Sequence, residues 1–293
     1  MDYLRPSQLL DIGESHVSLD LYRYRFLAEG DSWFSLGDTL APLTSNIVLE
    51  LLRVNTAHDV VVNCASPGET LRRMVDALSD PNFNRLLDGV QQRRWDALLL
   101  SAGGNDLIEA CALPADHAPA DRLLLRPEER VPNPSAGRDY VSPAGWERLA
   151  GYLRHNLATL MQRRDRSKSR SGDWKAPIFL HTYHRPVVRD APTGGGGPWL
   201  YRALAQAAFA IPPAHRQMVS DELFGRLRST LLGLHSPADR VYVFDSYGAV
   251  ELQAAAPEAH YASGDWLNEI HLTAPGYRKL AEKFQPFIDS HLP

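Results

Sequence analysis

Four positions far apart in the sequence have the residue types that acyl transfer needs. Ser32 supplies a hydroxyl, and His271 supplies an imidazole that could accept its proton. A serine hydroxyl is a poor nucleophile until a neighbouring base takes its proton, and the oxyanion that forms next needs N–H donors fixed in advance. Those donors would be the backbone N–H groups of Ser32 and Gly68 and the side-chain amide of Asn105. Together the four residues predict nucleophilic attack on a carbonyl carbon.

The elements that must position these residues alternate along the chain. Five apolar runs of strand length have the near-continuous hydrophobicity of parallel strands buried on both faces. They are residues 22–28, 58–65, 95–102, 176–183 and 240–247. Helices are predicted where leucines recur at helical spacing, over 149–160 and 223–234, and at a final segment of about 276–290. A further helix is predicted to begin at an N-cap, Asp38, and to run through Leu51. The alternation predicts a three-layer α/β/α sandwich around a five-stranded, mainly parallel sheet.

Each candidate residue follows one of the predicted strands. Ser32 comes after the first strand, Gly68 after the second, Asn105 after the third and His271 after the fifth. Because the carboxyl ends of parallel strands meet at one edge of a sheet, residues more than two hundred positions apart can converge there. Asp31 and Asp106 are expected to brace the loops around this edge through hydrogen bonds to the backbone.

These residues also resemble a known family. Gly30-Asp31-Ser32, Gly68, Gly103-x-Asn105-Asp106 and the late His271 are similar, in order and placement, to the four signature blocks of the SGNH (GDSL-type) hydrolase superfamily. The similarity runs from residue 25 to 280, and the ending "WLNEIHLTAPGY" resembles bacterial members with an Asn-Glu-Ile-His last block.

The resemblance implies a flavodoxin-like SGNH hydrolase fold, with Ser32 as nucleophile and His271 as base. It also implies Ser32, Gly68 and Asn105 as oxyanion donors. The expected activity is cleavage of carboxylic esters through an acyl-serine intermediate, with no cofactor and no metal. The superfamily's range includes lipid esters, aryl esters, thioesters and acetylated sugars, and acyl transfer to an alcohol stays open beside hydrolysis.

One position departs from the family pattern. An Asp usually stands three residues before the catalytic His, where it orients the ring and stabilises the imidazolium, but this chain has Asn268 there. In serine proteases the Asp-to-Asn change costs about 10⁴ in kcat. The missing carboxylate could come from Asp265, which we prefer, or from Glu269, or a Ser–His dyad could suffice without one.

The chain is expected to form one domain over residues 1–293, with variable loop insertions at about 112–146 and 185–213. The second loop contains four consecutive glycines, Gly194 to Gly197, which remove backbone restraint as a mobile flap requires. A plain surface loop would have the same composition. His184 and Trp199, on either side of this run, are candidates for lining the substrate pocket.

Composition narrows the class of partner. A net charge of −4 supplies no field for polyanions, so a small-molecule ester is expected rather than nucleic acid. No apolar run has the length of a membrane span. The first residues lack the features of a secretion signal, and Cys64 and Cys111 read as free buried thiols, so a cytoplasmic location is expected. The composition does not predict an oligomeric state.

Two rival functions stay open. The first is a catalytically weak or inactive binding protein of the same fold, which the departure at Asn268 favours. The second is a metal-dependent phosphoesterase, but the chain has no Asp-x-His near its start and no paired His motif near its end. His181 and His184 would point to opposite faces of a strand, which argues against a shared metal ion.

Overall fold

The structure is a computed structural model, which describes residues 1–10, 17–37, 44–192 and 196–292. Its centre is a six-stranded sheet in the order β1-β3-β2-β4-β7-β8, in which all neighbouring strands are parallel. The strands are β1 (Asp2–Leu4), β2 (Arg25–Gly30), β3 (Val60–Asn63), β4 (Ala97–Ser101), β7 (Ile178–His181) and β8 (Val241–Phe244). A separate antiparallel hairpin joins β5 (Arg170–Ser171) to β6 (Trp174–Lys175).

All five predicted strands are present in the sheet, but the prediction of a five-stranded sheet is wrong, because the sheet has six strands. The extra strand is β1, which pairs with β3 at the edge of the sheet. It has only three residues, and Asp2 is exposed, so no apolar run marks it in the sequence. Without β1 the order of the remaining strands is that of the flavodoxin fold.

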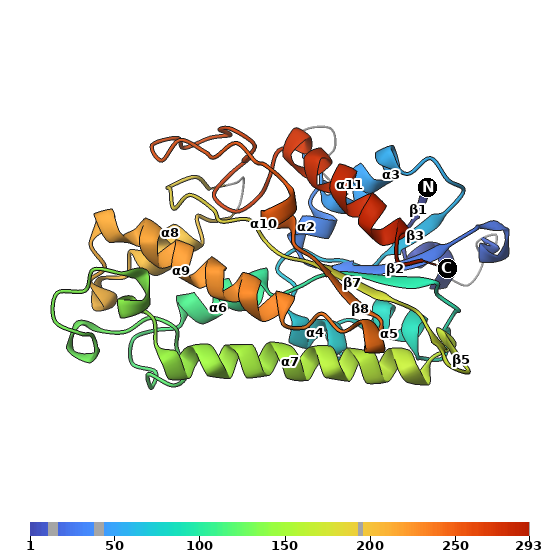
Figure 1. Ribbon diagram of the computed structural model, residues 1–293, viewed down its shortest axis with the longest axis horizontal. Helices are drawn as coiled ribbons and strands as arrows, with labels where there is room; N and C mark the ends of the chain where they lie inside the picture. The colour runs from blue at the N-terminus through green and yellow to red at the C-terminus, as the bar shows by residue number, and fades with distance from the viewer. Residues whose placement is uncertain (11–16, 38–43, 193–195, 293) are drawn as a thin grey trace.

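Helices cover both faces of the sheet, so the three-layer prediction is confirmed. Figure 1 shows α3 (Ile47–Val54) and α11 (Ala274–Asp289) on one face, and α4 (Leu71–Val75), α5 (Pro81–Leu87) and α7 (Pro143–Arg166) on the other. The remaining α-helices are α1 (Ser7–Leu10), α2 (Ser32–Ser35), α6 (Gly104–Ala112), α8 (Leu200–Leu204), α9 (Pro213–Leu232) and α10 (Ser246–Ala249). Short 3-10 helices are η1 (Leu19–Leu21), η2 (Pro127–Glu129), η3 (Gly137–Tyr140), η4 (Ala207–Phe209) and η5 (Pro237–Asp239).

The leucine repeats form the helices predicted for them, α7 and α9, and their leucines are buried in the core except Leu234, which lies beyond the end of α9 and is half-buried. The predicted cap at Asp38 lies outside the described residues. In the described part, α3 begins after Asn46, whose side-chain oxygen accepts a hydrogen bond from the Leu49 N–H at 2.8 Å. Cys64 and Cys111 are both free and buried, as predicted.

The two predicted insertions contain short helices, and the first also has a buried ion pair. In the first, the fully buried Arg122 binds Glu129, and a bridge joins Leu124 to Val141. The second contains α8 and η4, while Gly194 and Gly195 of the glycine run lie outside the described residues. Within the described chain no helix is both long and apolar enough to cross a membrane. The single domain over residues 1–293 stays a prediction.

Candidate active site

The turn that carries Ser32 is fixed by close packing and by a helix cap. At Gly30, the end of β2, an added Cβ atom would lie 2.8 Å from the Ser101 Cβ on β4, so only glycine fits there. The next residue, Asp31, caps α2 by accepting a hydrogen bond from the Trp33 N–H at 2.9 Å. Ser32 is therefore the first residue of α2, at the carboxyl edge of the sheet, and is 7% exposed.

His271 reaches the Ser32 hydroxyl, as the sequence predicts for a nucleophile and its base. The distance between His271 Nε2 and Ser32 Oγ is 2.7 Å, although the residues are 239 positions apart. The histidine loop is held against the nucleophile turn, because the Trp33 indole N–H donates to the Ile270 carbonyl at 3.1 Å. Burial lowers the pKa of His271 to about 4, so its ring is neutral at pH 7 and can accept a proton.

Asn268 is the residue that faces the other nitrogen of the ring. Its side-chain oxygen accepts from the backbone N–H groups of Ile270 at 3.0 Å and His271 at 2.9 Å. His271 Nδ1 lies 3.1 Å from Asn268 Oδ1 and 2.9 Å from Nδ2. A protonated Nδ1 can donate to the oxygen, whereas an unprotonated Nδ1 can accept from the amide. Asn268 therefore serves both tautomers of the ring, and only the first leaves Nε2 free to accept the serine proton.

Asp265, which the sequence analysis preferred as the carboxylate that orients His271, has other partners in the structure. Its carboxylate accepts from the Gln253 N–H at 2.6 Å and from Lys279 Nζ at 2.7 Å, whereas the ring of His271 meets Asn268 and Ser32. Glu269 does not supply the carboxylate either, because it accepts from the N–H groups of Leu200 and Tyr201 and so anchors α8. Burial raises the pKa of Glu269 to about 7.

A buried polar network under Ser32 was only partly predicted. Asp31 accepts from the Ser101 hydroxyl at 2.7 Å and from the Tyr183 hydroxyl at 2.5 Å, and Ser101 lies 3.0 Å from His181 Nε2. Burial outweighs these contacts and raises the pKa of Asp31 to about 6. The sequence predicted that Asp31 braces a loop, but Ser101 and Tyr183 gave no signal, since each is an ordinary strand or strand-end residue, and His181 was considered only as a metal ligand.

Of the predicted oxyanion donors, Ser32 and Asn105 line the cavity, whereas Gly68 does not line it. Asn105, on the first turn of α6, lines the same cavity as Ser32 and donates one amide hydrogen to the Glu69 carbonyl at 3.0 Å. Gly68 is exposed on the loop after β3, with φ at +79°, a conformation that favours glycine. Gly68 is not among the described residues that line the cavity. Asp106 braces this loop as predicted, since its carboxylate accepts from the Leu71 N–H.

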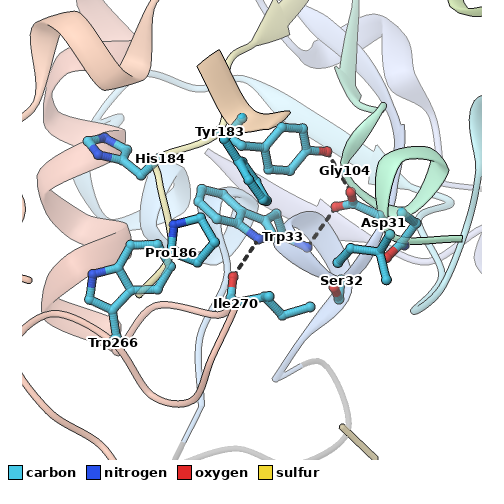
Figure 2. A pocket seen from close by; sticks show the side chains of 12 residues that line it. Asp31, Ser32, Trp33, Gly104, Tyr183, His184, Pro186, Trp266 and Ile270 are labelled. Atoms are coloured by element: carbon cyan, nitrogen blue, oxygen red, sulfur yellow. Dashed lines mark hydrogen bonds between the residues drawn. The ribbon is translucent and has the colours of Figure 1, made fainter. Parts of the chain in front are cut away.

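A small cavity of about 20 Å³ opens beside Ser32. Figure 2 shows the side chains around it. Its apolar lining comes from Trp33, Ile108, Pro186, Phe224, Trp266 and Ile270, and His184 lines it as predicted. Trp199 is not among the lining residues described, but its ring packs edge-on against His271 with centroids 5.6 Å apart. Among the described residues, no group of three or more His, Cys, Asp or Glu side chains is placed to hold a metal ion.

Solved structures that are similar to this chain include lipases and esterases. The lipase Lip_vut3 from a goat rumen metagenome aligns with a TM-score of 0.53 over 90% of this chain and 96% of the lipase, at 15% identity. An extracellular lipase from Streptomyces rimosus gives a TM-score of 0.48 over 92% and 99% of the two chains, at 15% identity. The aryl esterase from M. smegmatis gives 0.46 over 92% and 100%, at 13% identity.

At these identities the alignments show a shared fold alone. No protein-family model and no curated protein sequence matches the chain. The chain shares the three-layer α/β/α fold of the first of these lipases, which is the fold that the resemblance of the four sequence blocks implied.

Proposed function

We propose that this protein is a serine hydrolase of the SGNH superfamily that cleaves carboxylic esters through an acyl-serine intermediate. The observation that carries the proposal is the 2.7 Å contact between Ser32 Oγ and His271 Nε2, at the carboxyl edge of the sheet and beside a cavity. Ester-cleaving proteins with the same fold add general support, and the natural substrate would be a small molecule.

In the proposed first step, His271 Nε2 takes the Ser32 proton while Oγ attacks the ester carbonyl carbon. The tetrahedral oxyanion receives hydrogen bonds from the Ser32 backbone N–H and the Asn105 amide, with the Gly68 N–H as a third donor. The carbon–oxygen bond to the alcohol then breaks, and His271 returns the proton to the leaving oxygen. In the second half, His271 deprotonates a water molecule that attacks the acyl-serine, which releases the acid and restores the Ser32 hydroxyl.

An Asn at position 268, in place of an Asp, is expected to lower kcat. The imidazolium that forms in each half-reaction meets only the dipole of an amide, since the neighbouring carboxylates of Asp265 and Glu269 have other partners. Without a negative charge beside it, the imidazolium is less stabilised than in a Ser-His-Asp triad. We therefore infer a slower hydrolase than one with a complete triad, and the runner-up proposal is a catalytically weak or inactive SGNH-fold binding protein.

The cavity beside Ser32 supports a short acyl group. A volume of about 20 Å³ is little more than one water molecule needs, so a long acyl chain would require the aromatic lining to move. We expect 4-nitrophenyl acetate and propionate to have the highest kcat/KM in a series that extends to palmitate, with at least a tenfold fall by octanoate.

The series is measured in EDTA, with spontaneous hydrolysis subtracted. Activity that survives EDTA argues for the serine mechanism and against a metal-dependent phosphoesterase. Rates at the spontaneous level for every chain length would contradict the hydrolase and favour the binding protein. A maximum at long chains would contradict only the proposed acyl size.

A further inference from the structure

Two side chains beside His271, Trp199 and Glu269, have no part in the proposed mechanism. The ring of Trp199 lies perpendicular to the ring of His271, with centroids 5.6 Å apart. Trp199 is half-buried, so part of it meets solvent, whereas His271 is only 4% exposed. At its two nitrogens the His271 ring meets Ser32 and Asn268. The indole is therefore a side chain that packs against the base and also reaches the surface.

Two glycines pack closely against the indole of Trp199. A Cβ atom added at Gly197 would lie 2.7 Å from Cζ3 of the indole, and one added at Gly196 would lie 3.1 Å from Cζ2. Gly197 also has φ at +78°, a conformation that favours glycine. This close packing of backbone against the ring restricts the positions that the indole can take.

Glu269 joins the helix that follows Trp199 to the loop that carries His271. Trp199 is the N-cap residue of α8, and its side chain makes no capping hydrogen bond. The buried carboxylate of Glu269 does so instead, because it accepts from the N–H groups of Leu200 at 3.0 Å and Tyr201 at 2.6 Å. Since Glu269 is two residues from His271, this contact fixes Trp199 relative to the base.

Arg189, on the segment after β7, braces the same loop. Its guanidinium donates to the Asn268 carbonyl at 2.7 Å and to the carbonyls of Ala259 at 2.7 Å and Tyr261 at 2.6 Å. Its charge favours the ionised form of Glu269, but burial outweighs it and raises the pKa of that carboxyl to about 7. A protonated Glu269 still accepts through its carbonyl oxygen, so the contact to α8 is weakened rather than lost at lower pH.

The cover over His271 matters for its protonation. Exclusion of water disfavours a charged imidazolium, because the ion loses its hydration. Burial is the cause that lowers the pKa of His271 to about 4, from an ordinary value of about 6.5. A side chain that keeps solvent from this ring therefore determines how acidic the solution can become before the base is lost.

We propose that Trp199 is a positioning residue that covers the ring of His271 and keeps water from it, and that Glu269 holds Trp199 in this place. The inference rests on the proposed function, in which His271 accepts the Ser32 proton. Its consequence is that the protein keeps its base, and so its activity, in mildly acidic solution. Removing the cover would admit water to the imidazolium and move the loss of activity toward neutral pH.

The pH dependence of kcat/KM for 4-nitrophenyl acetate tests this inference. The midpoint of the acid fall is expected near pH 4 in the wild type and at about pH 5 or above in Trp199→Ala. Trp199→Phe keeps a smaller aromatic cover, so its midpoint should lie between these two. A side chain that served folding alone would change kcat/KM at every pH without moving the midpoint. Circular dichroism at each pH verifies that the chain is folded.

Variants of Glu269 test whether it acts through Trp199. Glu269→Leu removes both acceptors and should raise the midpoint, whereas Glu269→Gln keeps one accepting oxygen and should stay closer to the wild type. The double variant Trp199→Ala/Glu269→Leu should have the midpoint of Trp199→Ala alone, because both changes remove the same cover.

Tyr201→Ala is the matched control on α8. The Tyr201 ring packs against the guanidinium of Arg216, 5.5 Å from its centroid, and the substitution keeps the backbone N–H that Glu269 binds. Its midpoint should equal that of the wild type. If hydrolysis is too slow to measure, the midpoints are taken from the rate at which a fluorophosphonate labels Ser32.

The outcomes separate this inference from the proposed function. A wild-type midpoint in folded Trp199→Ala, or an equal shift in Tyr201→Ala, would overturn the role of Trp199 and leave ester hydrolysis standing. Shifts that add in the double variant would overturn the role of Glu269. If Trp199→Ala does not fold, unshifted midpoints in Trp199→Phe and Glu269→Leu would overturn the inference. If the wild type neither hydrolyses the ester nor is labelled at Ser32, the proposed function fails and this inference fails with it.

Discussion

Replacing Ser32 with Ala is expected to lower kcat/KM for 4-nitrophenyl acetate at least about a hundredfold, to near the spontaneous rate. The hydroxyl that would carry the acyl group is then missing, and His271 has no proton to accept. In an enzyme with a complete triad, removing the serine lowers kcat about 10⁶-fold. A site without the carboxylate starts from a lower kcat, so a smaller fold-decrease is expected here. His271→Ala should cost about as much, and the double variant no more than either single one, because the two residues act as a unit.

Ser35→Ala is the matched control for this prediction. Ser35 lies on the same helix, is equally buried, and donates its hydroxyl to the Asp31 carbonyl at 3.0 Å rather than facing His271. Its kcat/KM should stay within about threefold of the wild type. A Ser32→Ala protein that keeps more than about a tenth of the wild-type rate would show that Ser32 is not the nucleophile.

Replacing Asn268 with Asp is expected to raise kcat tenfold or more, against a ceiling of about 10⁴ taken from the reverse change in serine proteases. The carboxylate can keep the backbone hydrogen bonds of Ile270 and His271, which one oxygen accepts now. Its second oxygen would accept from His271 Nδ1–H and cannot donate to an unprotonated Nδ1. The change therefore enforces the productive tautomer and adds a negative charge beside the imidazolium.

The pH profile supplies an independent readout of the same change. Burial holds the pKa of His271 at about 4, so kcat/KM of the wild type should fall only as the pH drops through about 4 and the base becomes protonated. A carboxylate at position 268 favours the protonated ring and should move this fall to higher pH. An unchanged circular dichroism spectrum across the pH range of this fall excludes acid unfolding as the cause.

Asp265→Asn is the control in the same loop, and its kcat should stay within about threefold of the wild type, because Asp265 binds Lys279 and the Gln253 backbone. An unchanged kcat in Asn268→Asp, or a larger effect at Asp265, would contradict the assignment of Asn268 as the residue that orients His271.

The layers of the fold follow from signals that are strong within short windows of sequence. Continuous apolar runs marked five strands, and leucine periodicity marked α7 and α9, because burial on two faces or on one helical face dictates those patterns. The edge strand β1 was missed because three residues with one exposed side chain bury too little to leave a pattern.

The site was predictable where a residue directly follows a strand, as for Ser32 and Asn105, and His271 was placed through its similarity to the family's last block. It was not predictable where a contact depends on the path of a loop. Asp265 and Asn268 are three positions apart, and only the structure shows that Lys279 takes the carboxylate while His271 meets the amide. That Nε2 of His184 has no hydrogen-bond partner among the described residues is likewise a property of packing, since it depends on which groups surround the ring.

The measurement that tests the central claim most directly is labelling with a fluorophosphonate, followed by mass spectrometry of the intact protein and of its peptides. A fluorophosphonate reacts quickly only with a hydroxyl whose proton a neighbouring base accepts. We predict one adduct per chain, on the peptide that contains Ser32, in the wild type and in Ser35→Ala, and none in Ser32→Ala. No adduct in the wild type, or equal labelling of Ser32→Ala, would contradict the proposal that Ser32 is an activated nucleophile.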